Sequence, residues 1–169
     1  MDALEAIMTR RSIRRFSDEP VTDEQIETIV RAAMQAPSAG NQRPWRFIVL
    51  RDRARLSEVS KTSPYAGMLA EAAFGLVVCS ETEGLRHPMM WEQDCSAAVE
   101  NALLAAHAMG LGAVWLGFHP KEERVQPLKD LLGLPRNIEP LAVLAVGVPA
   151  EQKEPADRYD PSLVHEDAW

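Results

Sequence analysis

Cysteine is scarce in this sequence, which has only Cys79 and Cys95 among its 169 residues. Cys79 falls in an apolar run typical of a strand and Cys95 in a run typical of a helix, so we expect two buried, reduced thiols and neither a disulfide nor a redox pair. The four histidines have no metal-ligand spacing, and no G-x-S-x-G or H-E-x-x-H motif surrounds them. The sequence therefore predicts no metal site and no protein nucleophile.

Long hydrophobic runs and excess positive charge are also lacking. The longest apolar runs, such as Leu141 to Val148, have the length of a strand, and the N-terminus has no signal-peptide pattern, so we expect a cytoplasmic protein without membrane contact. Lys and Arg number 18 against 25 Asp and Glu, a net charge of −7, which argues against nucleic acid as a partner. With 46% hydrophobic residues, residues 1–169 can bury the core of a single globular domain.

Against this acidic background, one short segment gathers positive charge: Arg10-Arg11-Ser12-Ile13-Arg14-Arg15-Phe16. Guanidinium groups match phosphate oxygens in bidentate geometry, and the serine hydroxyl adds a donor, so the run predicts a phosphate-binding segment. A solvated basic helix end explains the run alone equally well, because Arg is favoured where a helix dipole turns negative.

Two further segments combine polar and backbone donors. The loop Pro37-Ser38-Ala39-Gly40-Asn41-Gln42-Arg43-Pro44-Trp45 presents hydroxyl, amide and backbone groups between prolines, which suits the polar edge of a flat heteroaromatic ring. An ordinary turn accounts for the loop alone at least as well. In Gly110-Leu111-Gly112-Ala113-Val114-Trp115-Leu116-Gly117, the first glycines end a helix, and Gly117 at a strand end permits a ligand to approach the backbone.

Hydrophobic spacing and capping signals predict four strands and about six helices. The helices begin with a short one capped by Asp2 and one that starts at the capping box Thr22 to Gln25 and stops at Pro37. The other expected helices are Ala54–Ser60, Tyr65–Ala73, a nearly all-apolar Trp91–Met109, and Glu122–Leu132. The expected strands are Phe47–Leu50, Gly75–Cys79, Ala113–Phe118 and Leu141–Val148.

This uneven order indicates an α+β sandwich with helices on both faces of one sheet. A doubly wound nucleotide-binding fold is the alternative, weakened because no strand leads into G-x-G-x-x-G and no G-x-x-x-x-G-K-[ST] occurs. A helix that is apolar nearly all round needs cover on several sides, which favours a homodimer. Residues after Pro149 form a polar, proline-bearing tail that is expected to dock on the partner.

The order of these motifs resembles the FMN-dependent nitroreductase family in its compact form, over essentially the whole chain. The motifs are Arg10 to Phe16, Pro37-Ser38 with Asn41 and Pro44-Trp45, Gly110-Leu111-Gly112, and Asp157-Arg158-Tyr159. The resemblance implies a nitroreductase-like α+β sandwich whose central mixed sheet is flanked by helices. It also implies an intertwined homodimer that binds FMN in two interface sites, with the tail, residues 149–169, embracing the other subunit.

The resemblance also implies roles for individual residues. Arg10, Arg11 and Ser12 would bind the FMN phosphate and ribityl chain, and Arg14 would lie near the N1/O2 edge of the ring, where it tunes the flavin. The remaining expected contacts are Pro37, Ser38 and Asn41 from the other subunit, the backbone of Leu116 and Gly117 at the N5/O4 side, and Arg158 with Lys153 at the phosphate. NADH or NADPH would reduce the flavin at N5, and a small planar acceptor, a nitroaromatic or a quinone, would then take the hydride in a ping-pong cycle.

The sequence also departs from the family pattern. Arg43 stands where the family often has Gln directly before Pro-Trp, and the chain lacks much of the segment that roofs the flavin in larger relatives. Tyr65, Met68, Met89, Met90 and Trp91 could line an acceptor pocket, although such clusters are more often core. Reductive dehalogenation or enone reduction in the same fold, and a non-catalytic flavin-binding or flavin-sensing role, remain alternatives.

Overall fold

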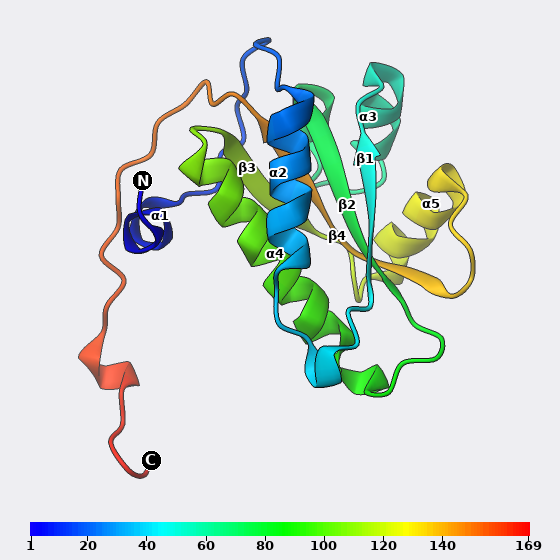
Figure 1. Cartoon of the computed structure of the whole chain (residues 1–169). Helices are drawn as coiled ribbons and strands as arrows, with labels where there is room; N and C mark the ends of the chain where they lie inside the picture. Colours follow the sequence, from blue (N-terminus) through cyan, green and yellow to red (C-terminus); the bar gives the residue numbers. More distant parts are fainter.

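The computed structural model describes residues 1–169 and is built on a four-stranded sheet with the order β1-β2-β4-β3. Its strands are β1 (Trp45–Leu50), β2 (Phe74–Glu81), β3 (Gly112–Gly117) and β4 (Ile138–Gly147) (Figure 1). All neighbouring strands run antiparallel, and the only parallel pairing is an isolated bridge between Ser12 and Ala113. The mixed sheet expected above is thus corrected to an antiparallel one, because the order of elements along a chain does not fix the direction in which strands pair.

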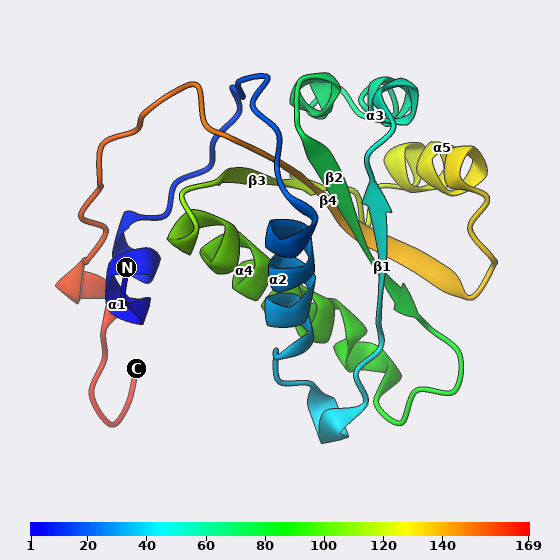
Figure 2. The same cartoon turned by 45° about the horizontal axis from the view of Figure 1, so that its top comes forward.

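Helices cover both faces of this sheet, as predicted. Helices α2 (Asp23–Met34) and α4 (Trp91–Ala108) pack on one face, and α3 (Arg53–Val59) and α5 (Glu122–Leu132) on the other (Figure 2). Strand β2 supplies both cores, because successive side chains of a strand point to opposite faces. Leu76 and Val78 join the α2/α4 core, whereas Val77 and Cys79 join the α3/α5 core.

Local signals in the sequence explain where the helices begin and end. Asp2 caps α1 (Ala3–Thr9) by accepting from the Glu5 N–H, and Thr22 and Gln25 form the predicted capping box of α2. Gly133 ends α5 in the left-handed conformation, with φ of 64°. The helix expected over Tyr65–Ala73 is only a short 3-10 turn, η2 (Gly67–Ala70), and Gly67 lowers the helix propensity of this stretch.

Helix α4 is buried along most of its length, with Cys95, Ala98, Val99 and Ala106 fully enclosed. Cys79 and Cys95 are both buried and free, as predicted, and the Cys95 thiol donates to the Cys79 carbonyl over 3.6 Å. Burial raises the pKa of each thiol to about 12, with the nearby Glu139 carboxylate adding to the effect at Cys79. Neither cysteine is a nucleophile at neutral pH.

The two ends of the chain lie side by side, away from the sheet. Helix α1 lies at the side of the main body, in contact with α4, and residues after β4 pass beside it toward the C-terminus (Figures 1 and 2). Both segments expose apolar side chains: Leu4 and Met8 on α1 are 71% and 68% exposed, and Leu163 and Trp169 in the tail are 76% and 102% exposed. No helix combines the length and the hydropathy that crossing a bilayer would require.

Candidate functional site

The basic segment, residues 10–16, is fixed by pairing with the chain that follows β4. The Ser17 N–H donates to the Val148 carbonyl and the Ala150 N–H to the Arg15 carbonyl, each over 2.9 Å. Phe16 and Pro149 are thereby paired as an antiparallel β-bridge. On its other side the segment meets the edge of β3, where Ile13 N–H donates to the Ala113 carbonyl over 3.0 Å. The segment is therefore an extra strand-like element at the β3 edge of the sheet.

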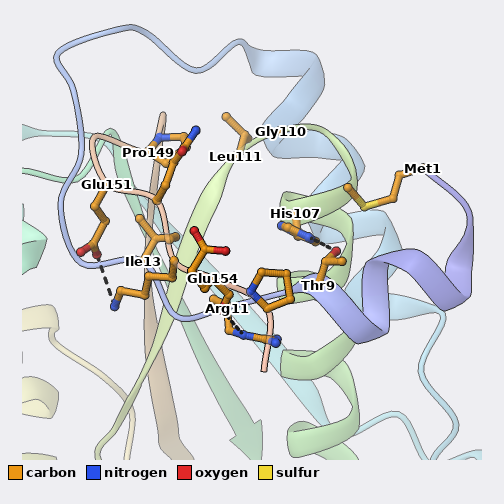
Figure 3. A pocket seen from close by; sticks show the side chains of 13 residues that line it. Met1, Thr9, Arg11, Ile13, His107, Gly110, Leu111, Pro149, Glu151 and Glu154 are labelled. Atoms are coloured by element: carbon orange, nitrogen blue, oxygen red, sulfur yellow. Dashed lines mark hydrogen bonds and ion pairs between the residues drawn. The ribbon is translucent and has the colours of Figure 1, made fainter. Parts of the chain in front are cut away.

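Arg10, Arg11, Lys153 and Arg158 are brought together at the start of this segment. Arg11 donates to the carbonyls of Glu154 and Ala156 over 3.3 and 3.2 Å, which ties the tail to the basic segment. Lys153 Nζ donates to the Ser12 carbonyl over 2.7 Å. Arg10, Arg11 and Arg158 line one pocket of about 450 Å³, and Arg11 and Lys153 line a neighbouring one of about 400 Å³ (Figure 3).

The Arg10 guanidinium has an unsatisfied donor. Its Nε lies 3.5 Å from Glu100 Oε1, but the atom is buried and makes no hydrogen bond. A buried N–H without an acceptor costs free energy, so an acceptor supplied by a ligand would be bound favourably at this position.

His107, which the motifs did not single out, lines the same region. Thr9 Oγ1 donates to the Glu5 carbonyl over 2.6 Å, so the 2.8 Å contact between Thr9 Oγ1 and His107 Nε2 is made by the imidazole N–H as donor (Figure 3). Burial lowers the pKa of His107, and the positive charges of Arg10 and Arg11 lower it further. The imidazole is therefore neutral and packs α1 against the end of α4.

Arg14 belongs to a different pocket, of about 540 Å³, which we call the Arg14 pocket. It is lined by Arg14, Pro64, Tyr65, Gly67, Met68, Val114, Trp115, Leu116, Gly117 and Arg124. Glu151 holds the Arg14 backbone in place, because its Oε1 accepts from the Arg14 N–H over 2.6 Å. This bond is the main reason why the pKa of Glu151 is lowered, and the Lys153 charge, 3.5 Å away, contributes.

Gly117 presents its backbone to the Arg14 pocket. Backbone groups of a strand alternate between its two edges. The Ala113 carbonyl faces the basic segment, at the edge of β3 away from β4, and the Phe118 N–H donates to the Leu141 carbonyl of β4. Counting along β3, the backbone groups of Gly117 therefore point to the same free edge as those of Ala113, and the backbone groups of Leu116 point to β4. The Gly117 carbonyl accepts from Arg124 over 3.2 Å, and no atom would lie within 4 Å of a Cβ at this position. The Gly117 N–H therefore points away from β4, at a residue that lines the pocket.

Pro37, Ser38 and Asn41 lie in a third place, the amide loop, residues 37–43. Asp94, which is 4% exposed, fixes this loop by accepting from the Ala39 N–H over 2.8 Å and from Gln42 Nε2 over 2.7 Å. The backbone turns through a positive φ at Gly40, where a Cβ would come 2.8 Å from His87 Nε2. The Arg43 N–H donates to Ser38 Oγ over 3.0 Å. The sequence motifs did not identify Asp94 as the residue that fixes this loop.

The amide loop and the basic segment do not meet within one chain. The amide loop follows the C-terminal end of α2, whereas the basic segment precedes this helix and runs along the edge of β3, and no pocket described above is lined by residues of both (Figure 1). The expected acceptor-pocket residues are likewise divided. Tyr65 and Met68 line the Arg14 pocket. Met89 does not line it and is 86% exposed, and the Trp91 ring packs edge-on against the His119 ring with 4.8 Å between the ring centroids. No group of His, Cys, Asp and Glu is arranged to hold a metal ion.

Comparison with known proteins gives consistent matches. A family model described as the nitroreductase family matches residues 7–148. An Archaeoglobus fulgidus protein that carries the provisional name NADH dehydrogenase/NAD(P)H nitroreductase is 48% identical, over 99% of both chains. A Clostridium acetobutylicum crystal structure, provisionally named NADH oxidase, superposes with a TM-score of 0.95 at 46% identity, over 97% of this chain and 99% of that one. A Desulfovibrio desulfuricans structure, provisionally named a nitroreductase and in complex with FMN, gives a TM-score of 0.85 at 35% identity, over 100% and 99% of the two chains.

Proposed function

The chain belongs to the nitroreductase family and is an oxidoreductase; on that premise we propose that it is a homodimeric FMN enzyme that uses NADH or NADPH to reduce a small planar acceptor, a nitroaromatic or a quinone. The proposal rests on one observation: the two ends of the basic segment, residues 10–16, line different pockets with different polar groups. Arg10, with its unsatisfied buried donor, and other cations lie at one end, and Arg14 lies at the other end in the pocket that Gly117 also lines.

The phosphate end fits the terminal phosphate of FMN. Arg10 offers the buried Nε that has no acceptor, and Arg11 and Arg158 line the same pocket. Ser12 and Lys153 adjoin this pocket through the 2.7 Å bond between Lys153 Nζ and the Ser12 carbonyl. Hydrogen bonds to charged groups contribute about 1.5–3 kcal/mol each, so this end would supply most of the affinity for the phosphate.

The Arg14 pocket fits the ring. FMN, when bound, supplies a ring that accepts hydride from NAD(P)H and passes it to the acceptor. Arg14 would place its positive charge near the N1/O2 edge and so favour the reduced state, and the Gly117 N–H would donate to the N5/O4 side. Glu151 holds the Arg14 backbone at this position. The protein would thus bind FMN, orient its ring and tune its reactivity, and no side chain would act as a nucleophile.

A second copy of the chain would complete the site. Pro37, Ser38 and Asn41 do not line the Arg14 pocket of their own chain, so the partner's amide loop would have to contact the ring. The exposed Leu4 and Met8 of α1 and the apolar side chains of the tail supply surface for such an assembly. The tail, residues 149–169, would embrace the partner.

Flavin binding and reduction test the proposal. The purified protein is expected to carry FMN or to take it up stoichiometrically, with much weaker binding of riboflavin in calorimetry, and NADH or NADPH should bleach its absorbance. Riboflavin binding as tight as that of FMN would refute the phosphate assignment. Bound FMN that neither nicotinamide reduces would favour a flavin-sensing protein, and turnover of halogenated aromatics or enones in place of nitroaromatics and quinones would identify the other reactions of the fold.

A further inference from the structure

The Arg14 pocket contains a second arginine, Arg124, to which the proposed function gives no role. Of the ten residues that line the pocket, Arg14 and Arg124 are the only charged ones, and none is Asp or Glu. The chain as a whole carries a net charge of −7. A cavity with two cations and no carboxylate in an acidic protein has a positive local potential and favours an anionic ligand.

Arg124 is held at the rim by two contacts that leave most of its donors free. It lies in the first turn of α5, its Nη1 donates to the Gly117 carbonyl over 3.2 Å, and its Cζ lies 4.9 Å from the centroid of the Tyr65 ring. No carboxylate lies within ion-pair distance of its guanidinium. A guanidinium has five N–H donors in a fixed fork, so one hydrogen bond leaves a face that matches a phosphate.

Tyr65 orients this cation without neutralising it. The side chain of Tyr65 is 64% exposed, so its ring forms the outer wall of the pocket. Contact of a guanidinium with an aromatic face restricts its rotamers and leaves the in-plane N–H groups available. The pair is therefore a preorganised anion-binding element, and its position next to Gly117 places it at the side where the ring of the flavin would be open to substrate.

We propose that Arg124, supported by Tyr65, binds a phosphate group of the nicotinamide dinucleotide that reduces the flavin. The inference rests on the proposed function, because it takes Arg14 and the Gly117 N–H as the ring contacts. A nicotinamide that reacts at the ring must enter the Arg14 pocket, and its phosphates then extend outward past the rim. The phosphate is either the pyrophosphate, which NADH and NADPH share, or the 2′-phosphate, which only NADPH carries. Comparing NADH with NADPH as the reductant distinguishes these two possibilities.

The test compares Arg124→Gln with the wild-type dimer, each loaded with FMN, using NADPH, NADH and reduced nicotinamide riboside, which has no phosphate. Gln can still donate to the Gly117 carbonyl but has no charge. We expect KM to rise about tenfold or more, as for loss of a charged hydrogen bond, with kcat and the reaction of the riboside unchanged. A rise for both dinucleotides identifies the pyrophosphate, and a rise for NADPH alone identifies the 2′-phosphate.

Direct binding provides a readout that does not depend on turnover. Titration of the oxidised protein with NADP⁺ and NAD⁺, followed by flavin absorbance, should show the same loss of affinity. Arg124→Lys should bind the dinucleotides more tightly than Arg124→Gln but less tightly than wild type. Tyr65→Phe should keep the wild-type affinity, whereas Tyr65→Ser should lower it. Arg136→Gln is the matched control, because Arg136 is exposed beyond the other end of α5 and its side chain makes no hydrogen bond or ion pair. The control should behave as wild type.

Three outcomes would overturn the inference. Unchanged dinucleotide binding in Arg124→Gln would show that the cation does not contact the phosphates. An equal loss with the riboside, or weaker binding of FMN, would show that Arg124 acts through Gly117 on the ring. The FMN content of the wild type, measured first, keeps the two proposals apart: a protein that takes up no FMN refutes the proposed function, whereas a loaded and reducible protein with an unaffected Arg124→Gln variant refutes only the inference.

Discussion

Glu151→Ala tests whether the chain after β4 positions Arg14. The Glu151 side chain, 22% exposed, accepts from the Arg14 N–H over 2.6 Å and lies 3.5 Å from Lys153 Nζ. Removing the carboxylate deletes the side-chain acceptor that holds Arg14 and leaves the neighbouring backbone pairing of Arg15 and Ser17 in place. The basic segment should then sample conformations in which Arg14 leaves the Arg14 pocket, so a smaller fraction of the protein is competent to bind FMN.

The magnitude follows from the type of bond. A hydrogen bond to a charged acceptor contributes about 1.5–3 kcal/mol and a neutral one about 0.5–1.5 kcal/mol. Glu151→Ala should therefore weaken FMN binding by at least about tenfold, and Glu151→Gln, which keeps an acceptor, should recover roughly half of that free energy. The midpoint potential of bound FMN should shift in both variants, because Arg14 is displaced relative to the ring. Calorimetry and redox titration measure the two effects.

Acid should reproduce the loss. The pKa of Glu151 is lowered in the folded protein, so its stabilising contribution is complete above the ordinary carboxyl pKa, about 4.3, and is lost as the pH falls through the lowered value. FMN release followed by fluorescence from pH 7 to pH 3 should be less steep in Glu151→Gln. Glu154→Ala is the matched control, since that side chain makes no hydrogen bond and only its carbonyl binds Arg11. An equal loss in the control, or wild-type FMN affinity in Glu151→Ala, would refute the reasoning.

Arg14→Ala should lower the flavin potential and slow reduction by NAD(P)H about a hundredfold while FMN stays bound, whereas Arg10→Ala should mainly weaken FMN binding; stopped-flow kinetics at saturating FMN separates the two, and reduction of Arg14→Ala at the wild-type rate would contradict the assigned roles. Truncation after Pro149 should release FMN and destabilise the dimer together, which sedimentation checks against the possibility of a flavin-loaded monomer. Cys79 and Cys95, each with a pKa of about 12, should resist a disulfide exchange reagent at pH 8 until the protein unfolds, and rapid labelling of the native protein would contradict their burial.

Sequence patterns predicted the elements well because helix ends and apolar periodicity are local properties. The bounds of α5, Glu122–Leu132, match the prediction, and the Thr22 to Gln25 capping box is formed. The segment from Tyr65 was predicted as a helix because its apolar spacing suits one, but it forms only a 3-10 turn, in which Gly67 disfavours the α-helix. Strand direction was not predictable from element order, and the sheet is antiparallel throughout its four strands.

The candidate site was predictable only where a motif carried it. Arg10 and Arg11 were found from the basic run and Arg158 from the family resemblance, and all three line one pocket. Asp94 and Glu151 carry no local signal, because their partners are distant in sequence: Gln42 is 52 residues before Asp94, and Arg14 is 137 residues before Glu151. Such positioning residues appear only when the fold places both partners together.

The same contacts bear on how the proposed site could be completed. The amide loop is fixed by Asp94, and the basic segment is fixed by residues 148–151, so neither half can move to the other without breaking several hydrogen bonds. A second copy of the chain would bring the two halves together without deforming either. Burying the exposed apolar side chains of α1 on that copy would contribute about 1.5–3 kcal/mol for each one fully covered. Because FMN would contact both copies, its binding free energy would add directly to that of dimerisation, so each should strengthen the other by the same factor.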